Sequence, residues 1–141
     1  MKEHHCMLCI FGATGDLTNR KLLPALYFLE QEKQLKDNFM VICIARRNKT
    51  NEQYRSEAAD AIKKFSRIKV NDEILKKLVS KIRYLRLEFS NRNDYVNLKR
   101  IMEEHAGEKC GKCERIFYLA VPSSSIGVIV NNLKSLGLAE R

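Results

Sequence analysis

Two glycines near the N-terminus stand between an apolar run and a helical pattern. Residues 6–11 read CMLCIF, Gly12 and Gly15 follow, and residues 17–32 carry apolar side chains at helical spacing. A glycine has no Cβ, so the backbone can come close to a ligand. The amides and the dipole of a first helical turn attract an anion. The spacing therefore predicts a phosphate-binding loop for a nucleotide or dinucleotide, with an ordinary strand-to-helix turn as the alternative.

Two arginines follow the second apolar run, residues 39–45 (FMVICIA). In dinucleotide-binding folds an acidic residue at this point binds the ribose 2′-hydroxyl of NAD, whereas an arginine accommodates the 2′-phosphate of NADP. Here Ala45 is followed by Arg46 and Arg47. A guanidinium binds a phosphate through paired, charge-assisted hydrogen bonds. The sequence therefore favours NADP over NAD, and solvated loop charges are the alternative.

The elements that must position these residues alternate along the chain. Apolar, β-prone runs occupy residues 6–11, 39–45, 82–89 and 116–121. Helical patterns occupy residues 17–32, 51–65, 73–80, 93–106 and 123–136. Strands separated by helices form parallel sheets through right-handed crossovers. We expect one α/β domain over residues 1–141, a partial Rossmann-like, doubly wound parallel sheet of four strands with flanking helices. Residues 82–89 alternate apolar and charged side chains, which indicates a strand nearer the sheet edge.

Local signals mark the helix ends. Thr50 and Gln53 have the spacing of a capping box, and Pro24 falls early in the first helix, where a missing amide is best tolerated. We expect Gly107 to stop the helix over residues 93–106 and Gly137 to end the last one.

Composition excludes several classes of function. The 141 residues include no run of about 18 apolar residues, so no membrane span is expected. No signal peptide is recognised, and five cysteines without one predict a cytoplasmic chain with free thiols. The formal net charge is +9, but no run of five or more basic residues occurs. We therefore interpret the charge as a basic surface that attracts phosphorylated metabolites rather than nucleic acid.

Three ordered motifs resemble one enzyme family. Residues 12–17 (GATGDL), with Lys21 and Pro24 following, resemble the coenzyme turn of glucose-6-phosphate dehydrogenases. The Ala45–Arg46 pair matches the A-R pair that ends the family's second strand, and residues 117–122 (FYLAVP) are similar to its F-Y-L-A-V/L-P-P motif. The resemblance implies the N-terminal NADP-binding part of an enzyme that oxidises glucose 6-phosphate to 6-phosphogluconolactone in the pentose phosphate pathway.

The resemblance also implies roles for single residues. The pyrophosphate would be held by Gly12, Ala13, Thr14, Gly15, Asp16 and Leu17. The residues beside the cofactor would be Ala120, Val121 and Pro122. Arg46 would bind the 2′-phosphate with help from Arg47. Lys21 matches a family lysine near the sugar-phosphate pocket, with a surface lysine as the alternative.

The sequence also departs from the family. Ser123 replaces the second proline of the motif, and Ile126 stands where some members carry an aromatic residue. The family segments that carry the active-site lysine and the histidine base, and the second domain, do not occur in residues 1–141. We therefore expect no catalytic residue here, NADP binding that is weak or absent, and no turnover of glucose 6-phosphate by this chain alone. Full-length members are homo-oligomers; the oligomeric state of this chain is not predicted.

Two other hypotheses come from the sequence. One is a stand-alone NADP-binding or regulatory module without catalysis, and the other, less favoured, is a short-chain-type reductase. His4, His5 and His105 are expected to be exposed or structural rather than catalytic.

The cysteines suggest a metal site as an alternative only. Cys6 and Cys9, and again Cys110 and Cys113, have zinc-ligand spacing. Cys9, like Cys43, lies in the middle of an expected strand, where a thiol behaves as a small core hydrophobe. We therefore predict no metal, and a site built from Cys6, Cys110 and Cys113 remains the alternative.

Overall fold

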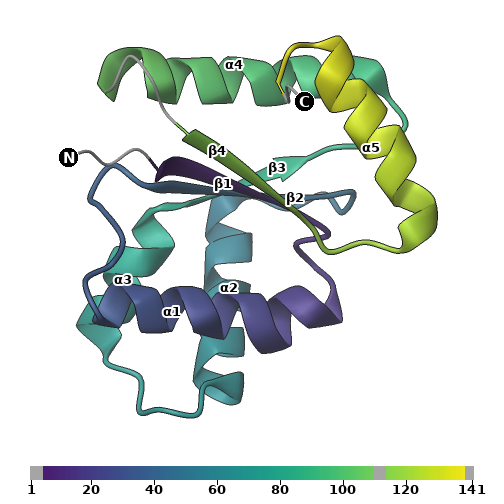
Figure 1. Cartoon of the computed structure of the whole chain (residues 1–141). Coiled ribbons are helices and arrows are strands. Elements are labelled where there is room, and N and C mark those ends of the chain that lie inside the picture. Colours follow the sequence, from purple (N-terminus) through teal and green to yellow (C-terminus); the bar gives the residue numbers. More distant parts are fainter. Residues whose placement is uncertain (1–4, 110–113, 139–141) are drawn as a thin grey trace.

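The chain folds into one parallel sheet with helices on both faces (Figure 1). The computed structural model describes residues 5–109 and 114–138. The strands are β1 (His5–Phe11), β2 (Met40–Ala45), β3 (Ile82–Arg86) and β4 (Glu114–Leu119). The helices are the π-helical turn η1 (Thr18–Leu22), α1 (Leu23–Gln31), α2 (Asn51–Phe65), α3 (Asp72–Ser80), α4 (Arg92–Lys109) and α5 (Ser123–Ser135).

The sheet is the middle of three layers. Helices α1, α2 and α3 cover one face, and α4 and α5 cover the other (Figure 1). Ile10 and Cys43 pack into the core on the α1 side, while Cys9 and Ile42 pack into the core on the α4 side. Both faces of the sheet are covered, and correspondingly β1 is apolar from residue 6 to residue 11 and β2 is apolar throughout. The predicted α/β fold class is confirmed.

The strand order brings three loops together. The order is β3-β2-β1-β4, so the chain moves outward from β1 to β3 and then returns to the other side of β1. Phe11 at the end of β1 lies level with Ile44 of β2 and Leu119 of β4. Open α/β sheets bind ligands at such a switch point, beyond the carboxyl ends of the strands. The fold therefore places the segments after β1, β2 and β4 around one site.

The first helix is less regular than the sequence indicated. Instead of a single helix over residues 17–32, a π-helical turn precedes α1, and the amide of Leu23 donates to the carbonyl of Thr18. Pro24 lies in the first turn of α1, directly after the π-helical turn.

Several predicted element ends are wrong. Strand β4 is Glu114–Leu119 rather than residues 116–121. Helix α4 continues through Gly107 to Lys109, since a glycine inside a helix costs only about 1 kcal/mol and does not stop it. Strand β3 ends at Arg86 rather than at residue 89, and Phe89 lies in the turn that follows.

The predicted capping box of α2 is confirmed. The Thr50 Oγ1 accepts from the Gln53 amide at 3.0 Å, and the Gln53 Oε1 accepts from the Thr50 amide at 2.8 Å. Thr50→Ala removes one of these bonds, so we expect the free energy of unfolding to fall by about 1 kcal/mol in urea denaturation. Thr50→Ser keeps the hydroxyl and should retain most of that stability. Equal midpoints for wild type and Thr50→Ala would contradict the assigned cap.

Candidate functional site

A hollow of about 420 Å³ lies at the carboxyl ends of β1, β2 and β4. We call it the carboxyl-end hollow. It is lined by Gly12, Thr14, Gly15, Ala45, Arg46, Arg47, Phe89, Ala120, Val121 and Pro122. The glycine loop, the arginines after β2 and the segment after β4, which lie far apart in the sequence, thus surround one space. Their roles toward a cofactor stay predictions.

The fold requires a glycine at position 12, independently of any ligand. Its φ is +94°, a backbone conformation that L side chains rarely adopt. A Cβ built on it would lie 2.1 Å from the carbonyl oxygen of Ala120. The amide of Ala120 meanwhile donates to the carbonyl of Phe11 at 2.8 Å, which holds β4 against β1. The absence of a side chain at Gly12 therefore lets the segment after β4 pass directly over the loop after β1.

Hydrogen bonds fix the rest of the glycine loop. The amides of Gly12 and Ala13 both donate to the carbonyl of Ile44, at 2.9 and 3.0 Å. The buried hydroxyl of Thr18 donates to the carbonyl of Gly12 at 3.0 Å. Tyr54 of α2 donates from its hydroxyl to the carbonyl of Ala13 at 2.8 Å. These hydrogen bonds fix the conformation of the loop up to the start of the helix. The amides of the first helical turn have no acceptor within the helix.

Three of the predicted loop residues do not line the hollow. Ala13 is completely buried, while Asp16 and Leu17 are exposed. The Asp16 carboxylate accepts from the Arg20 Nε at 2.9 Å, one turn further along the helix. A contact of Asp16 or Leu17 with a phosphate would therefore use the main-chain amide of the first turn.

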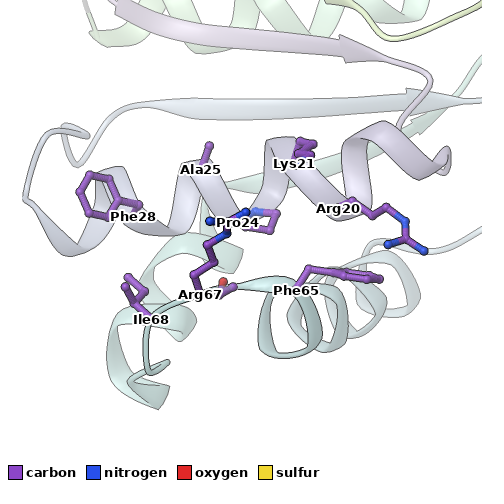
Figure 2. Close-up of a pocket in the computed structure, with 9 residues that line it drawn as sticks. Arg20, Lys21, Pro24, Ala25, Phe28, Phe65, Arg67 and Ile68 are labelled. Atoms are coloured by element: carbon purple, nitrogen blue, oxygen red, sulfur yellow. The ribbon is translucent and has the colours of Figure 1, made fainter.

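Lys21 lies beside a different groove. This groove, of about 470 Å³, runs between the first helix and the segment after α2, and Lys21 borders it together with Arg20, Pro24, Ala25, Phe28, Phe65, Ser66, Arg67 and Ile68. Figure 2 shows Arg20 extending over Phe65, with Lys21 on the other side of the same helix. Lys21 is exposed and does not line the carboxyl-end hollow. Its role in binding a sugar phosphate remains a prediction.

The two arginines after β2 are exposed and held differently. The Arg46 side chain is 68 % exposed, and its Nη1 lies 3.9 Å from the Glu88 Oε1. So long a pair between exposed groups contributes little to stability, which leaves the guanidinium able to bind another anion. Arg47 is fixed through its main chain, because its carbonyl accepts from the Tyr84 hydroxyl at 2.5 Å.

Phe89 is a lining residue that sequence reasoning missed. Its ring lies 5.9 Å from that of Phe11, edge to face, in the turn after β3. The pattern of residues 82–89 placed it inside a strand. The signal that could have found it is its position after a strand that ends at the same sheet edge.

The described thiols belong to the core. Cys9 and Cys43 are free and completely buried, which confirms their expected packing role. Burial raises the pKa of each thiol to about 12. Cys110, Cys113 and the side chain of Cys6 lie outside the described residues, so the zinc alternative is untested. Among the side chains that the structure describes, no group of three or more potential metal ligands occurs.

The raised pKa of Cys43 predicts a loss of stability in alkali. The unfolded thiol releases its proton above its ordinary pKa of 9.0, while the folded thiol keeps it until about 12. The unfolded state is therefore favoured as pH rises through that range. From about pH 8 to about pH 10, the unfolding free energy of wild type should fall by about 1.4 kcal/mol more than that of Cys43→Ala. Parallel pH curves in urea denaturation would contradict this.

A Tyr-x-x-x-Lys pair, which the short-chain reductase hypothesis would need, does occur at Tyr95 and Lys99. However, Tyr95 is completely buried and its hydroxyl donates to the carbonyl of Phe89 at 2.8 Å. Burial raises its pKa to about 12. A tyrosine so enclosed cannot reach a substrate, so the structure does not support that hypothesis.

Other expectations are only partly covered by the structure. His4 and the side chains of His5 and His105 lie outside the described residues. In the part of the chain that the structure describes, no helix has the length and apolar character to cross a membrane.

Comparison with known proteins gives consistent matches. The family model described as "Glucose-6-phosphate dehydrogenase, NAD binding domain" matches residues 9–141. Glucose-6-phosphate 1-dehydrogenase of Chlamydia pneumoniae is 41 % identical over 128 residues, which is 91 % of this chain and 25 % of that protein. The enzyme of Chlamydia muridarum is 40 % identical over 129 residues, with the same two shares. The chain thus spans about a quarter of the length of these curated relatives.

Solved structures agree with the sequence matches. The crystal structure of glucose-6-phosphate 1-dehydrogenase from Mycobacterium avium has a TM-score of 0.82 and 29 % identity, covering 99 % of this chain and 29 % of that one. A glucose-6-phosphate dehydrogenase in complex with its substrate glucose-6-phosphate has a TM-score of 0.86 and 30 % identity, covering 99 % of this chain and 30 % of that one.

Proposed function

Because the chain belongs to the glucose-6-phosphate dehydrogenase family, with its NAD-binding domain matching residues 9–141, we propose that the carboxyl-end hollow binds NADP. In the complete protein this domain would serve the oxidation of glucose 6-phosphate to 6-phosphogluconolactone. The bound NADP would supply the acceptor for the hydride that leaves C1 of the sugar. We also propose that the complete protein acts in the pentose phosphate pathway and in the cytoplasm.

One observation carries the cofactor assignment. The glycine loop, two exposed arginines and the segment after β4 line a single hollow at the switch point of the sheet. Switch points of this kind accommodate dinucleotides, with the pyrophosphate at the N-terminus of the first helix. The residues present fit such a ligand in shape and in charge.

Each wall of the hollow would bind a different part of the cofactor. The backbone of Thr14 and Gly15, with the first helical amides at Asp16 and Leu17, would hold the pyrophosphate. Arg46 and Arg47 would bind the 2′-phosphate, because an exposed guanidinium with only a distant carboxylate partner can pair with it. The segment after β4 would lie beside the cofactor through Ala120, Val121 and Pro122.

The hollow offers no group for proton transfer. Among the described residues, its lining contains no histidine, carboxylate or lysine. Oxidation of an alcohol needs a base to take the hydroxyl proton. Residues 1–141 alone should therefore produce no NADPH from glucose 6-phosphate. A stand-alone NADP-binding or regulatory module would share this property. Lys21 could assist with the sugar phosphate only from outside the hollow.

The test is a titration with both cofactors. Ligand-detected NMR registers weak binding, and we expect NADP to bind at least about tenfold more tightly than NAD, a difference of about 1.4 kcal/mol. Equal affinities would refute the NADP assignment, and no binding of either would refute the site. Measurable NADPH formation by this chain alone would refute the proposed lack of catalysis.

A further inference from the structure

Two stacked tyrosines behind the carboxyl-end hollow have no role in the function proposed above. We propose that Tyr54 of α2 and Tyr84 of β3 are positioning residues for the two cofactor-binding loops, and that Tyr84 supports selectivity for NADP over NAD. This inference rests on the proposed function, since it concerns how the same hollow distinguishes the two cofactors.

Tyr54 holds the glycine loop from below. Its side chain is buried, with 2 % of the residue exposed. Its hydroxyl donates to the carbonyl of Ala13 at 2.8 Å, across 41 residues of sequence. Ala13 is itself completely buried, so no water can replace that donor. Removing the hydroxyl would leave a buried carbonyl without this bond, which favours a reoriented peptide in the loop.

Tyr84 holds the arginine segment in the same way. Its hydroxyl donates to the carbonyl of Arg47 at 2.5 Å. Its own amide donates to the Asn51 Oδ1 at 2.7 Å, which ties β3 to the first turn of α2. Arg46, the neighbour of Arg47, has only the long pair with Glu88 among the described side chains. The hydrogen bond to the Arg47 carbonyl is therefore a principal constraint on the main chain from which the two arginine side chains extend.

The two tyrosines form one unit. Their rings stack with centroids 5.1 Å apart and an interplanar angle of 24°. Burial raises the pKa of both Tyr54 and Tyr84, so each hydroxyl keeps the proton that it donates. One rigid pair thus donates to a carbonyl in each of two loops, and stacking maintains the spacing between them.

The two hydroxyls should nevertheless have different effects on binding. The loop at Ala13 would contact the pyrophosphate, which NADP and NAD share. The segment at Arg47 would contact only the 2′-phosphate, which NAD lacks. Tyr54→Phe should therefore weaken both cofactors by the same factor, and Tyr84→Phe should weaken NADP alone. If Tyr84→Phe only destabilised the fold, it would not lower the affinity for NADP relative to the affinity for NAD.

The experiment measures the affinities of NADP and NAD for the 141-residue chain by ligand-detected NMR. For Tyr84→Phe we expect a loss of about three- to tenfold for NADP and no change for NAD, as one hydrogen bond implies. For Tyr54→Phe we expect a similar loss for both. Tyr27→Phe is the matched control, because the buried Tyr27 hydroxyl accepts from the Asn71 amide, away from the hollow. It should change the urea midpoint but neither affinity.

A double-mutant cycle tests the route through the arginine segment. If Tyr84 acts by placing the guanidinium groups, Tyr84→Phe should have little further effect on NADP once Arg46→Ala is present. Full additivity, or an unchanged ratio of NADP to NAD affinity in Tyr84→Phe, would overturn the inference while leaving the proposed function intact. A wild-type chain that binds neither cofactor, or does not prefer NADP, would instead overturn the proposed function and this inference with it.

Discussion

Gly12→Ala should destabilise the chain by about 2–5 kcal/mol and abolish cofactor binding. The added methyl would lie 2.1 Å from the Ala120 carbonyl oxygen, a main-chain atom that cannot turn aside. Overpacking of this kind costs about 1–3 kcal/mol, and the positive φ of 94° adds about 1–2 kcal/mol for a residue with a Cβ. Relief requires β4 to move from β1, which would break the bond from the Ala120 amide to the Phe11 carbonyl.

Urea denaturation and NADP titration measure the two effects, and Gly127→Ala is the matched control. A Cβ at Gly127, on α5, would meet nothing within 4 Å. That variant should be as stable as wild type or more stable by about 0.5–1 kcal/mol, since alanine suits a helix interior better than glycine. If Gly12→Ala had the same urea midpoint as Gly127→Ala, the close approach of the two segments would be wrong.

The Gly12 prediction also shows what the sequence could not supply. The glycine spacing correctly indicated a turn between a strand and a helix, and the natural explanation was room for a ligand. The structure shows a second cause, the Ala120 carbonyl, which approaches from a segment more than a hundred residues away. Such a contact depends on which strand lies beside β1, and no local pattern contains that information.

The sheet itself was predictable because its cause is local. The apolar runs indicated β1, β2 and β4, and the alternating pattern of residues 82–89 indicated that β3 lies nearer an edge. The apolar run of β4 did not reveal that this strand forms the other edge, where Ile116 and Tyr118 are exposed. The ends of elements were less predictable. Gly107 does not end α4, because a single unfavourable propensity is small beside the helical bonds around it.

The sequence allowed the segments that form the site to be predicted, but not which of their side chains line it. Sequence reasoning named the three loops, yet it could not say that Ala13 points into the core or that Lys21 borders another groove. The direction of a side chain at the start of the first helix depends on the π-helical turn, which residue types did not reveal. Phe89 was missed for a similar reason, since β3 ends three residues earlier than its pattern indicated.

Arg46→Ala should weaken NADP binding by about 10–100-fold and leave NAD binding unchanged. A hydrogen bond to a charged group contributes about 1.5–3 kcal/mol, and each 1.4 kcal/mol is about tenfold in affinity. The native Arg46 side chain is 68 % exposed and lies 3.9 Å from the Glu88 carboxylate. Binding of a phosphate would therefore cost only a weak ion pair. NAD has no 2′-phosphate, so its affinity should not change.

Arg83→Ala is the matched control for the loss of one positive charge. Arg83 is exposed on β3 and does not line the hollow. If Arg46 acts by direct pairing, only Arg46→Ala should change the ratio of NADP to NAD affinity, and the change should persist at high salt, where long-range attraction is screened. An equal effect of both variants would mean that the net charge of +9 attracts the cofactor without a specific phosphate site. Unchanged NADP affinity in Arg46→Ala would remove the main support for NADP over NAD.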